Sequence, residues 1–190
     1  MSSHAHRSPP THSRSVELQL AVPTPAHMHA FLGAVSRSRS LHAPWVEPPD
    51  SPFAYRTYLE RIESGSCIGH LVIDAEGELC GTVNLNQVVR GAYQSAQLSY
   101  YAFAPHSGRG LTGKAVRQVI MLAFCTYGLN RLEAAIQPAN QASRMLAVTA
   151  GLRCEGLATD FMKIGGHWRD HERWAITAGE WRLRHHKGSV

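Results

Sequence analysis

A glycine-rich segment, HSGRGLTGKA at residues 106–115, carries the clearest chemical signal in this sequence. It lies between an apolar stretch typical of a strand and a stretch whose apolar residues recur at helical spacing. Glycines at such a junction let the backbone approach a ligand, and the free N–H groups at the start of a helix attract an anion. The segment, which includes the basic residues Arg109 and Lys114, is therefore predicted to bind a phosphate group.

A P-loop is one pattern that this segment partly matches. Gly108, Gly113 and Lys114 have the required spacing, but Ala115 stands where a P-loop needs a hydroxyl group for magnesium. In addition, no neighbouring apolar stretch ends in an obvious metal-binding aspartate. The P-loop interpretation is therefore poor.

A dinucleotide-binding fingerprint is a second pattern, since Gly108, Gly110 and Gly113 match G-x-G-x-x-G. This fingerprint needs an acidic residue at the end of the following strand, where it binds a ribose. Glu133 lies at about the right distance but opens that strand, and the preceding strands look antiparallel. This interpretation remains a weaker rival.

The pyrophosphate loop of an acyl-CoA transferase is the third pattern. It must follow a strand whose end offers backbone donors to the arm of the cofactor. Residues 100–103, which precede Pro105, would supply such an end. A glycine-rich turn without a ligand is less consistent with three glycines and two basic residues at a helix start.

The elements that must position this loop are predicted from apolar periodicity and from turn residues. Antiparallel hairpins followed by one strand–helix–strand crossover favour a mixed sheet with helices on both faces. Residues 16–181 are expected to form one α/β (α+β) domain between a disordered tail, 1–15, and a flexible tail, 182–190. The expected strands are 17–22, 66–74, 79–86, 95–103, 131–137, 152–164 and 171–177.

The amino-acid composition limits which classes of function the chain can have. The formal charge is +5, but much of it lies near the two ends, so nucleic acid is not an expected partner. The sequence has neither an apolar run long enough to span a bilayer nor an N-terminal signal, which predicts a cytoplasmic protein without membrane partners. Its four single cysteines favour reduced, mostly buried thiols over disulfides or a zinc site, and no metal is expected.

The segments that follow the glycine loop make the third pattern specific. They are Arg131-Leu132-Glu133, Pro138-x-Asn140-x-x-Ser143 and Gly151-Leu152-x-x-Glu155-Gly156, with Gly166-x-Trp168-x-Asp170-His171 near the end. With these motifs the sequence resembles the GNAT superfamily, and within it the ribosomal-protein-alanine (RimJ/RimL-like) N-acetyltransferases. The resemblance runs from about residue 17 to residue 181. It implies a GNAT fold with a mixed, mostly antiparallel sheet of six to seven strands and a splayed parallel pair at the acyl-CoA site.

The resemblance also implies which residues hold acetyl-CoA as co-substrate. Two positions depart from the usual family pattern: Ser107 replaces Gln or Arg, and Thr112 replaces Gly or Ala. The pantetheine arm would lie along Tyr101, Ala102 and Phe103, with Asn140 and Ser143 beside it. The pyrophosphate would lie on the backbone of Gly108, Arg109, Gly110, Thr112 and Gly113.

The implied reaction is direct transfer of an acetyl group to a primary amine in a ternary complex. Ala147 stands where many family members have an acidic tyrosine, and the resemblance then assigns Ser143 as the acid and Glu155 as the base. Interpretations without a role in binding or catalysis stay open, because Asn140 is also a good helix N-cap and Glu155 could be a solvated strand residue.

The acceptor is expected to be the α-amine of a protein N-terminus. Trp45 and Glu47, in a proline-rich loop, and Asp170 are candidates for the wall of the acceptor site. A small-molecule amine, such as an amino acid or an antibiotic, and a non-catalytic acyl-CoA-binding module are the alternatives. The resemblance also leaves a homodimer open.

Overall fold

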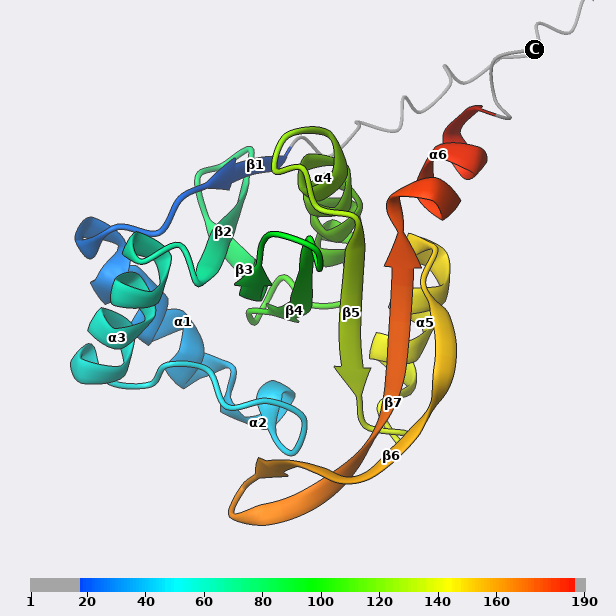
Figure 1. Cartoon of the computed structure of the whole chain (residues 1–190). Helices are drawn as coiled ribbons and strands as arrows, with labels where there is room; N and C mark the ends of the chain where they lie inside the picture. The colour runs from blue at the N-terminus through cyan, green and yellow to red at the C-terminus, as the bar shows by residue number, and fades with distance from the viewer. Residues whose placement is uncertain (1–17, 187–190) are drawn as a thin grey trace, which may run out of the picture.

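The computed structural model describes residues 18–186, which form one mixed sheet between two layers of helices (Figure 1). The strands are β1 (Leu18–Ala21), β2 (Cys67–Asp74), β3 (Leu79–Val89), β4 (Ser95–Ala102), β5 (Arg131–Ile136), β6 (Arg153–Ile164) and β7 (His167–Thr177). The helices are α1 (Met28–Arg37), α2 (Arg39–His42), α3 (Pro52–Glu63), α4 (Leu111–Cys125), α5 (Gln141–Ala150) and α6 (Ala178–His186), with a 3₁₀ turn, η1 (Pro25–His27), before α1.

The seven strands have the order β1-β2-β3-β4-β5-β7-β6. All neighbouring pairs are antiparallel except β4 and β5, which α4 connects as a crossover. This confirms the predicted α/β fold, the mixed sheet and its single parallel pair.

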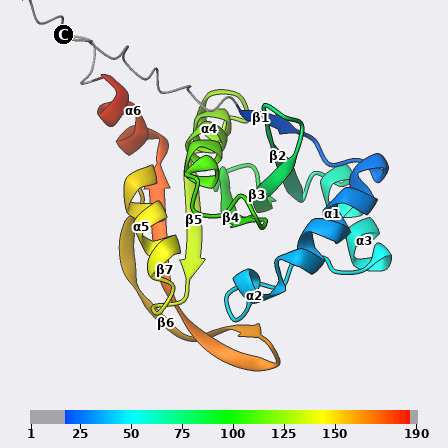
Figure 2. The ribbon, with the colours of Figure 1, turned by 180° about the vertical axis from the view of Figure 1, so that it is seen from behind.

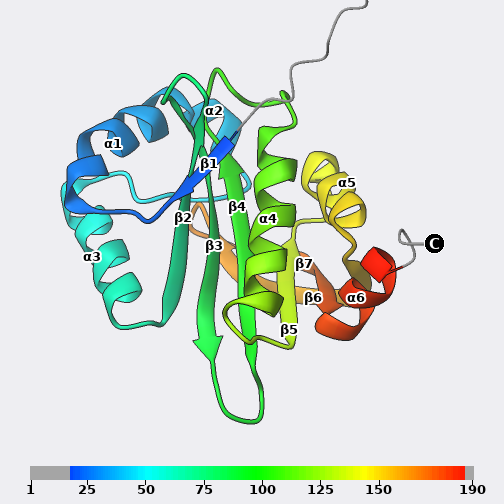
Figure 3. The ribbon, with the colours of Figure 1, turned by 90° about the horizontal axis from the view of Figure 1, so that it is seen from above.

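Helices cover both faces of the sheet, and each layer encloses a core (Figures 2 and 3). On one face α4 and α5 pack against β3, β4 and β5 around residues such as Leu98, Val116 and Leu132. On the other face α1 and α3 pack against β2 and β4 around Phe31 and Tyr55. Side chains alternate along β4, so Tyr100 belongs to the first core and Tyr101 to the second.

Local sequence signals explain where several helices begin and end. Ser51 caps α3: its hydroxyl accepts a hydrogen bond from Ala54 N–H at 3.2 Å, and Pro52 takes the first helical position. Gly151 ends α5 with φ of 96°, a left-handed conformation that a residue with a side chain rarely adopts.

Several strand ends shift by one residue, β3 continues to Val89 past the expected end at residue 86, and three other boundaries differ from the sequence-based expectation. The last strand begins at His167 rather than at residue 171, because it pairs with β6 as far as the Gly165-Gly166 turn. The proline-rich loop, which the prolines predict over residues 41–50, begins later, because the short helix α2 takes in Leu41 and His42.

The third difference is at the C-terminus, where residues 182–186 continue helix α6 instead of starting a tail. Thr177 and Glu180 bond each other's backbone N–H groups, the capping box that starts a helix. Trp181 then packs against Phe124. The predicted tail 1–15, the first residue of the predicted first strand and residues 187–190 lie outside the described residues.

Two further expectations concern the thiols and the membrane. All four cysteines are free, but only Cys67 and Cys80 are buried, whereas Cys125 and Cys154 are exposed. Among the described residues, none of the helices is long and apolar enough to cross a membrane.

Candidate active site between strands β4 and β5

The parallel strands β4 and β5 pair over only three residues and then separate. Their register ends at Gln97 opposite Glu133, although β4 continues to Ala102 and β5 to Ile136. Unpaired edges therefore face each other beyond this point. The glycine-rich loop follows β4 on one side of the opening, and α5 follows β5 on the other (Figure 1).

Two glycines give the loop its shape. Gly108 and Gly110 have φ of 78° and 77°, and a Cβ atom at either position would meet open space. Glycine is therefore needed at both positions for its backbone conformation and not for lack of room. Gly113 has ordinary helical geometry, and its nearest potential neighbour is the Arg117 side chain at 3.6 Å.

The start of α4 has the features of an anion site. Its first intrahelical bond runs from Lys114 N–H to the carbonyl of Gly110 at 3.2 Å, so the N–H groups of residues 111–113 have no acceptor within the helix. The half-buried Thr112 lies in this first turn. Arg109 is exposed and donates to Nδ1 of His106 at 3.0 Å. Free N–H groups at a helix start attract anions, and the phosphate site stays a prediction.

The backbone of β4 presents only some of the predicted groups to the opening. Phe103 N–H donates to the Cys80 carbonyl of β3 at 2.8 Å, and Tyr101 is registered with Thr82 of the same strand. Neighbouring residues in such a ladder direct their polar groups to opposite sides. Ala102 therefore faces the opening, whereas Tyr101 and Phe103 face β3 and bury their side chains in the core of α1 and α3.

Asn140 and Ser143 meet on the α5 side of the opening. The Asn140 carboxamide oxygen accepts Ser143 N–H at 3.1 Å, the N-cap expected from sequence. The Ser143 hydroxyl lies 3.0 Å from the hydroxyl of Tyr100 on β4, and that phenol also lies 3.2 Å from the Ser143 carbonyl. Tyr100 was not a predicted site residue.

The Tyr100 phenol is held in its protonated form. Burial raises the pKa of Tyr100 to about 12, although the hydrogen bond with Ser143 acts in the opposite direction. The phenol has one hydrogen: while it donates to the Ser143 carbonyl, the serine hydroxyl is the donor in the 3.0 Å contact. When the phenol hydrogen turns to Ser143 Oγ instead, the serine hydrogen is free to point toward another acceptor. This contact joins β4 to α5 across the opening.

Glu155 lies on the opposite face of the sheet, in a network of ion pairs. Its carboxylate bonds the guanidinium groups of Arg131 and Arg153. The hydrogen bonds from these two arginines lower the pKa of Glu155 to about 2. A carboxylate this acidic binds a proton too weakly to take one readily from an ammonium group. The base role of Glu155 stays a prediction, and this pairing disfavours it.

Glu133 lies at the last residue of the parallel pairing and belongs to the same network. Arg131 donates to it at 2.7 Å, Gln97 donates at 3.1 Å, and Arg173 also pairs with it. Burial alone would raise the pKa of Glu133, but the donors and cations around it give a net lowering. Its position at the start of β5 and its arginine partners also remove the dinucleotide interpretation, which needs a free acid at the strand end.

The loop at residues 43–47 closes the other side of the opening. Gln137 Nε2, just after β5, donates to the Pro44 carbonyl at 3.0 Å and lies 3.5 Å from that of Trp45. Glu47 accepts Gly165 N–H at 2.8 Å, which ties the loop to the β6–β7 turn. The far end of this hairpin passes below α2 in Figure 1.

His42 anchors the same loop to β4. Its ring is buried, and Nε2 donates to the Ala102 carbonyl at 2.8 Å. Burial lowers the pKa of His42, so the imidazole is neutral and Nδ1 carries the lone pair. Nδ1 is itself buried without a hydrogen-bond partner. Asp170, the remaining predicted acceptor residue, accepts Asp160 N–H at 2.9 Å in the irregular part of β6.

Comparison with known proteins identifies the architecture. Residues 17–153, more than half of the chain, match the model of the acetyltransferase (GNAT) domain. The chain is 38% identical over 120 residues to a probable N-acetyltransferase, YjcK, of Bacillus subtilis, covering 63% of this chain and 66% of that protein. It is 34% identical over 106 residues to the [ribosomal protein uS5]-alanine N-acetyltransferase of Escherichia coli, covering 56% and 55%. The matches thus span two thirds or less of these relatives.

Solved structures share the fold at low sequence identity. RimJ of Mycobacterium smegmatis, in complex with CoA-disulfide, has a TM-score of 0.77 at 22% identity, over 88% of this chain and 89% of that chain. Spermidine N-acetyltransferase of Vibrio cholerae, with CoA and spermine, has a TM-score of 0.75 at 20% identity, over 87% and 98%. The family match and the splayed pair of strands lead to one conclusion: the chain belongs to the GNAT acetyltransferase family.

Proposed function

We propose that this chain transfers the acetyl group of acetyl-CoA to a primary amine, in a ternary complex without an acyl-enzyme. The observation that carries the proposal is the opening between β4 and β5, with an anion-binding loop at one edge and the Tyr100–Ser143 contact at the other. The phosphates of the cofactor would bind the loop and the start of α4. Its arm would run along the free edge of β4 at Tyr100 and Ala102.

Ser143 would act on the departing thiolate. With Tyr100 donating to its oxygen, the Ser143 hydroxyl can donate to sulfur, and each hydrogen bond strengthens the other. The thiolate is stabilised by this donation and needs no proton from serine, since a thiol has a pKa near 8.5. Asn140, which caps α5 through its oxygen, keeps its amide nitrogen for the arm.

The acceptor amine would enter from the side of the loop at residues 43–47. A protein α-amine has a pKa near 7.7–8.0, so a usable fraction is neutral at pH 7 without a strong base. The identity to the uS5-alanine acetyltransferase favours a protein N-terminus. The structural likeness to spermidine acetyltransferase makes polyamines the second class of acceptor to test.

The acceptor is tested by incubating the full chain and acetyl-CoA with N-terminal peptides and small amines, followed by mass spectrometry. Acetylated peptide α-amines with unmodified polyamines support the proposal, and the reverse result assigns a small amine. If CoA binds but none of the amines is acetylated, the chain is an acyl-CoA-binding module and the proposed activity is wrong.

The cofactor site is tested by Gly110→Val. A β-branched residue cannot keep φ of 77° without strain, and its side chain would enter the anion site. Losing two charge-assisted hydrogen bonds would weaken CoA binding by about 100-fold or more in calorimetry. Gly91→Val is the matched control, because Gly91 has φ of 67° and equally open surroundings in the β3–β4 hairpin. Equal affinity of the two variants would mean that the loop does not bind the cofactor.

A further inference from the structure

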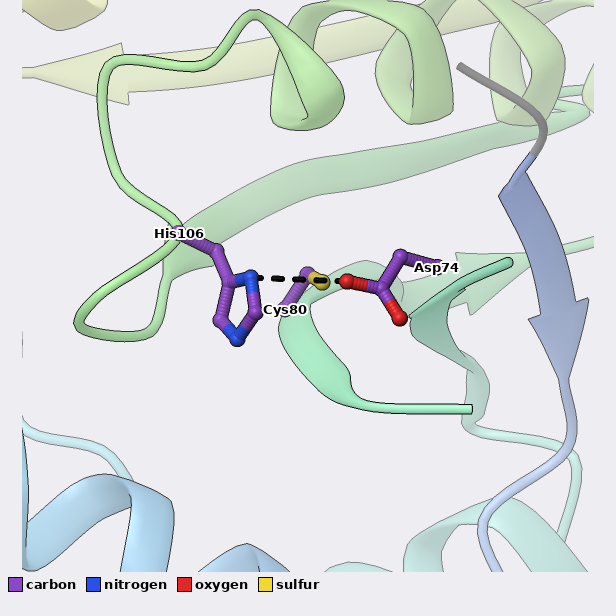
Figure 4. A group of neighbouring side chains, drawn as sticks. All are labelled: Asp74, Cys80 and His106. Atoms are coloured by element: carbon purple, nitrogen blue, oxygen red, sulfur yellow. Dashed lines mark ion pairs between the residues drawn. The ribbon is translucent and has the colours of Figure 1, made fainter. Parts of the chain in front are cut away.

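Three potential metal ligands from separate segments meet beside the glycine loop. Asp74 ends β2, Cys80 lies in β3, and His106 belongs to the loop after β4 (Figure 4). One ligand atom of each residue lies within 4.8 Å of the other two. Asp74 and Cys80 are buried, and the His106 side chain is only 10% exposed.

The spacing of these atoms suits an ion better than a hydrogen bond. His106 Nδ1 and Asp74 Oδ2 are 3.5 Å apart, which is too long for a good hydrogen bond. Nitrogen and oxygen ligands bound tetrahedrally to zinc at 2.0–2.1 Å stand about 3.3 Å apart. The Cys80 sulfur lies within 4.8 Å of both atoms. A small shift would therefore place all three at coordinating distance.

The surroundings orient the ligands. Asp74 Oδ1 accepts N–H groups from Glu76 at 3.2 Å and Glu78 at 2.9 Å, which leaves Oδ2 facing His106. Such support of the first ligands from behind is a regular feature of metal sites. The hairpin turn between β2 and β3 thus fixes the carboxylate before any ion binds.

The histidine presents a lone pair to the cluster. Arg109 can only donate, so its hydrogen bond at 3.0 Å makes Nδ1 of His106 the acceptor, and an ion bound by the same lone pair would displace the exposed Arg109 side chain. The Cys80 thiol is buried and donates to the Glu78 carbonyl at 3.3 Å, and a bound cation would deprotonate it.

We propose that Asp74, Cys80 and His106 bind one divalent ion of the zinc class at the base of the glycine loop. The mixed oxygen, sulfur and nitrogen donors match Zn²⁺ and its spectroscopic substitute Co²⁺ rather than Mg²⁺ or Ca²⁺. Binding releases the thiol proton to solvent and leaves a fourth position for water. The ion would tie β2 and β3 to the loop two residues before Gly108.

The test uses the full chain, stripped of metal with a chelator and titrated with Co²⁺. A cobalt–thiolate charge-transfer band identifies a cysteine ligand, so histidines elsewhere in the chain, which has 12, do not produce it. The expected result is a band that saturates at one equivalent and is removed by Zn²⁺. Absence of the band would overturn the proposal.

Cys80→Ser tests the ligand directly, and Cys67→Ser is its control, because Cys67 is the other buried free thiol. The band should survive in Cys67→Ser and disappear in Cys80→Ser; its survival in Cys80→Ser would assign the ion elsewhere. His106→Ala, in a loop and not in the sheet, guards against misfolding of Cys80→Ser and should weaken Co²⁺ binding at least about 10-fold. Unchanged affinity in a folded His106→Ala variant would also overturn the site. None of these readouts depends on acetyl transfer.

Discussion

The two faces of the splayed strands differ in how their polar groups are engaged. On the α4–α5 face, Tyr100 and Ser143 share neutral hydrogen bonds at 3.0 and 3.2 Å. On the opposite face, Glu133 and Glu155 are held by arginines. A hydroxyl pair can turn toward an incoming group at little cost, whereas freeing a carboxylate breaks several charge-assisted bonds.

This difference changes the interpretation of the spacing between Ser143 and Glu155. The resemblance implied an acid and a base that act together. Between Ser143 and Glu155, however, helix α5 ends, the chain turns at Gly151 and strand β6 begins. The two side chains therefore lie on opposite faces of the sheet. Spacing along the chain therefore predicted the helices and strands but not the hydrogen-bond and ion-pair partners of each side chain.

The largest effect is expected at the neutral face. Ser143→Ala should lower kcat about 10- to 100-fold with little change in the KM of acetyl-CoA, because the donor acts on the developing thiolate. Tyr100→Phe should lower kcat about 10-fold. The double variant should be no slower than Ser143→Ala, since Tyr100 acts through Ser143.

Tyr127→Phe is the control for loss of a phenol, because Tyr127 bonds His70 away from the opening. Its kcat should stay at the wild-type value. If the kcat losses of Tyr100→Phe and Ser143→Ala multiply in the double variant, the two hydroxyls act separately. Full activity of Ser143→Ala would mean that Ser143 does not act on the thiolate.

Substitutions on the charged face should change the free energy of unfolding more than kcat. Glu155→Gln leaves Arg131 and Arg153 without this partner, and after screening by solvent we expect a loss of about 1 kcal/mol in the free energy of unfolding. The kcat should stay within about threefold of wild type, whereas loss of a general base costs 10²–10⁴-fold. Glu180→Gln, which also removes a partner of Arg153, provides the comparison in urea unfolding and in kinetics.

The pH dependence of the free energy of unfolding provides a second test of the ion pairs on the charged face. Since folding lowers the pKa of Glu155 to about 2, the carboxylate stabilises the folded state above its unfolded pKa, near 4.3. This contribution is lost as pH falls from about 4.5 toward 2. The stabilities of wild type and Glu155→Gln should therefore converge over this window in urea unfolding. A constant difference down to pH 2.5 would contradict the ion-pair role.

A similarly small effect is expected at His42, which precedes the loop at residues 43–47 and bonds β4. His42→Phe keeps an aromatic ring beside Tyr101 and Phe103 but removes the bond to the Ala102 carbonyl. We expect about 1 kcal/mol less stability and a few-fold higher KM for the acceptor, with CoA affinity retained. An altered CoA affinity with an unchanged acceptor KM would place the loop on the cofactor side instead.

Much of the fold was predictable because local signals agree with the final structure. Alternating apolar residues in β2 to β4, the Ser51-Pro52 start of α3 and the glycines that end helices each act within a few residues. The missed C-terminal helix also had a local signal, since Thr177 and Glu180 have capping-box spacing. The start of the last strand had none, because pairing with β6 decides it.

The site was predictable to the extent that its parts are contiguous. The glycine loop and the Asn140–Ser143 cap are short motifs whose geometry the backbone imposes. The partners of Ser143 and Glu155 come from β4 and β5, and their identity depends on which strands lie side by side.

By itself, the sequence predicted the glycine loop as an anion site, the GNAT family and the order of the elements, because glycine conformations, helix caps and apolar periods act over short distances. The tertiary structure decided three things: that Tyr100 bonds Ser143, that two arginines pair with Glu155, and that Asp74, Cys80 and His106 lie close together. Each of these depends on strand register and on which face a side chain takes, and both are fixed only when the sheet has assembled.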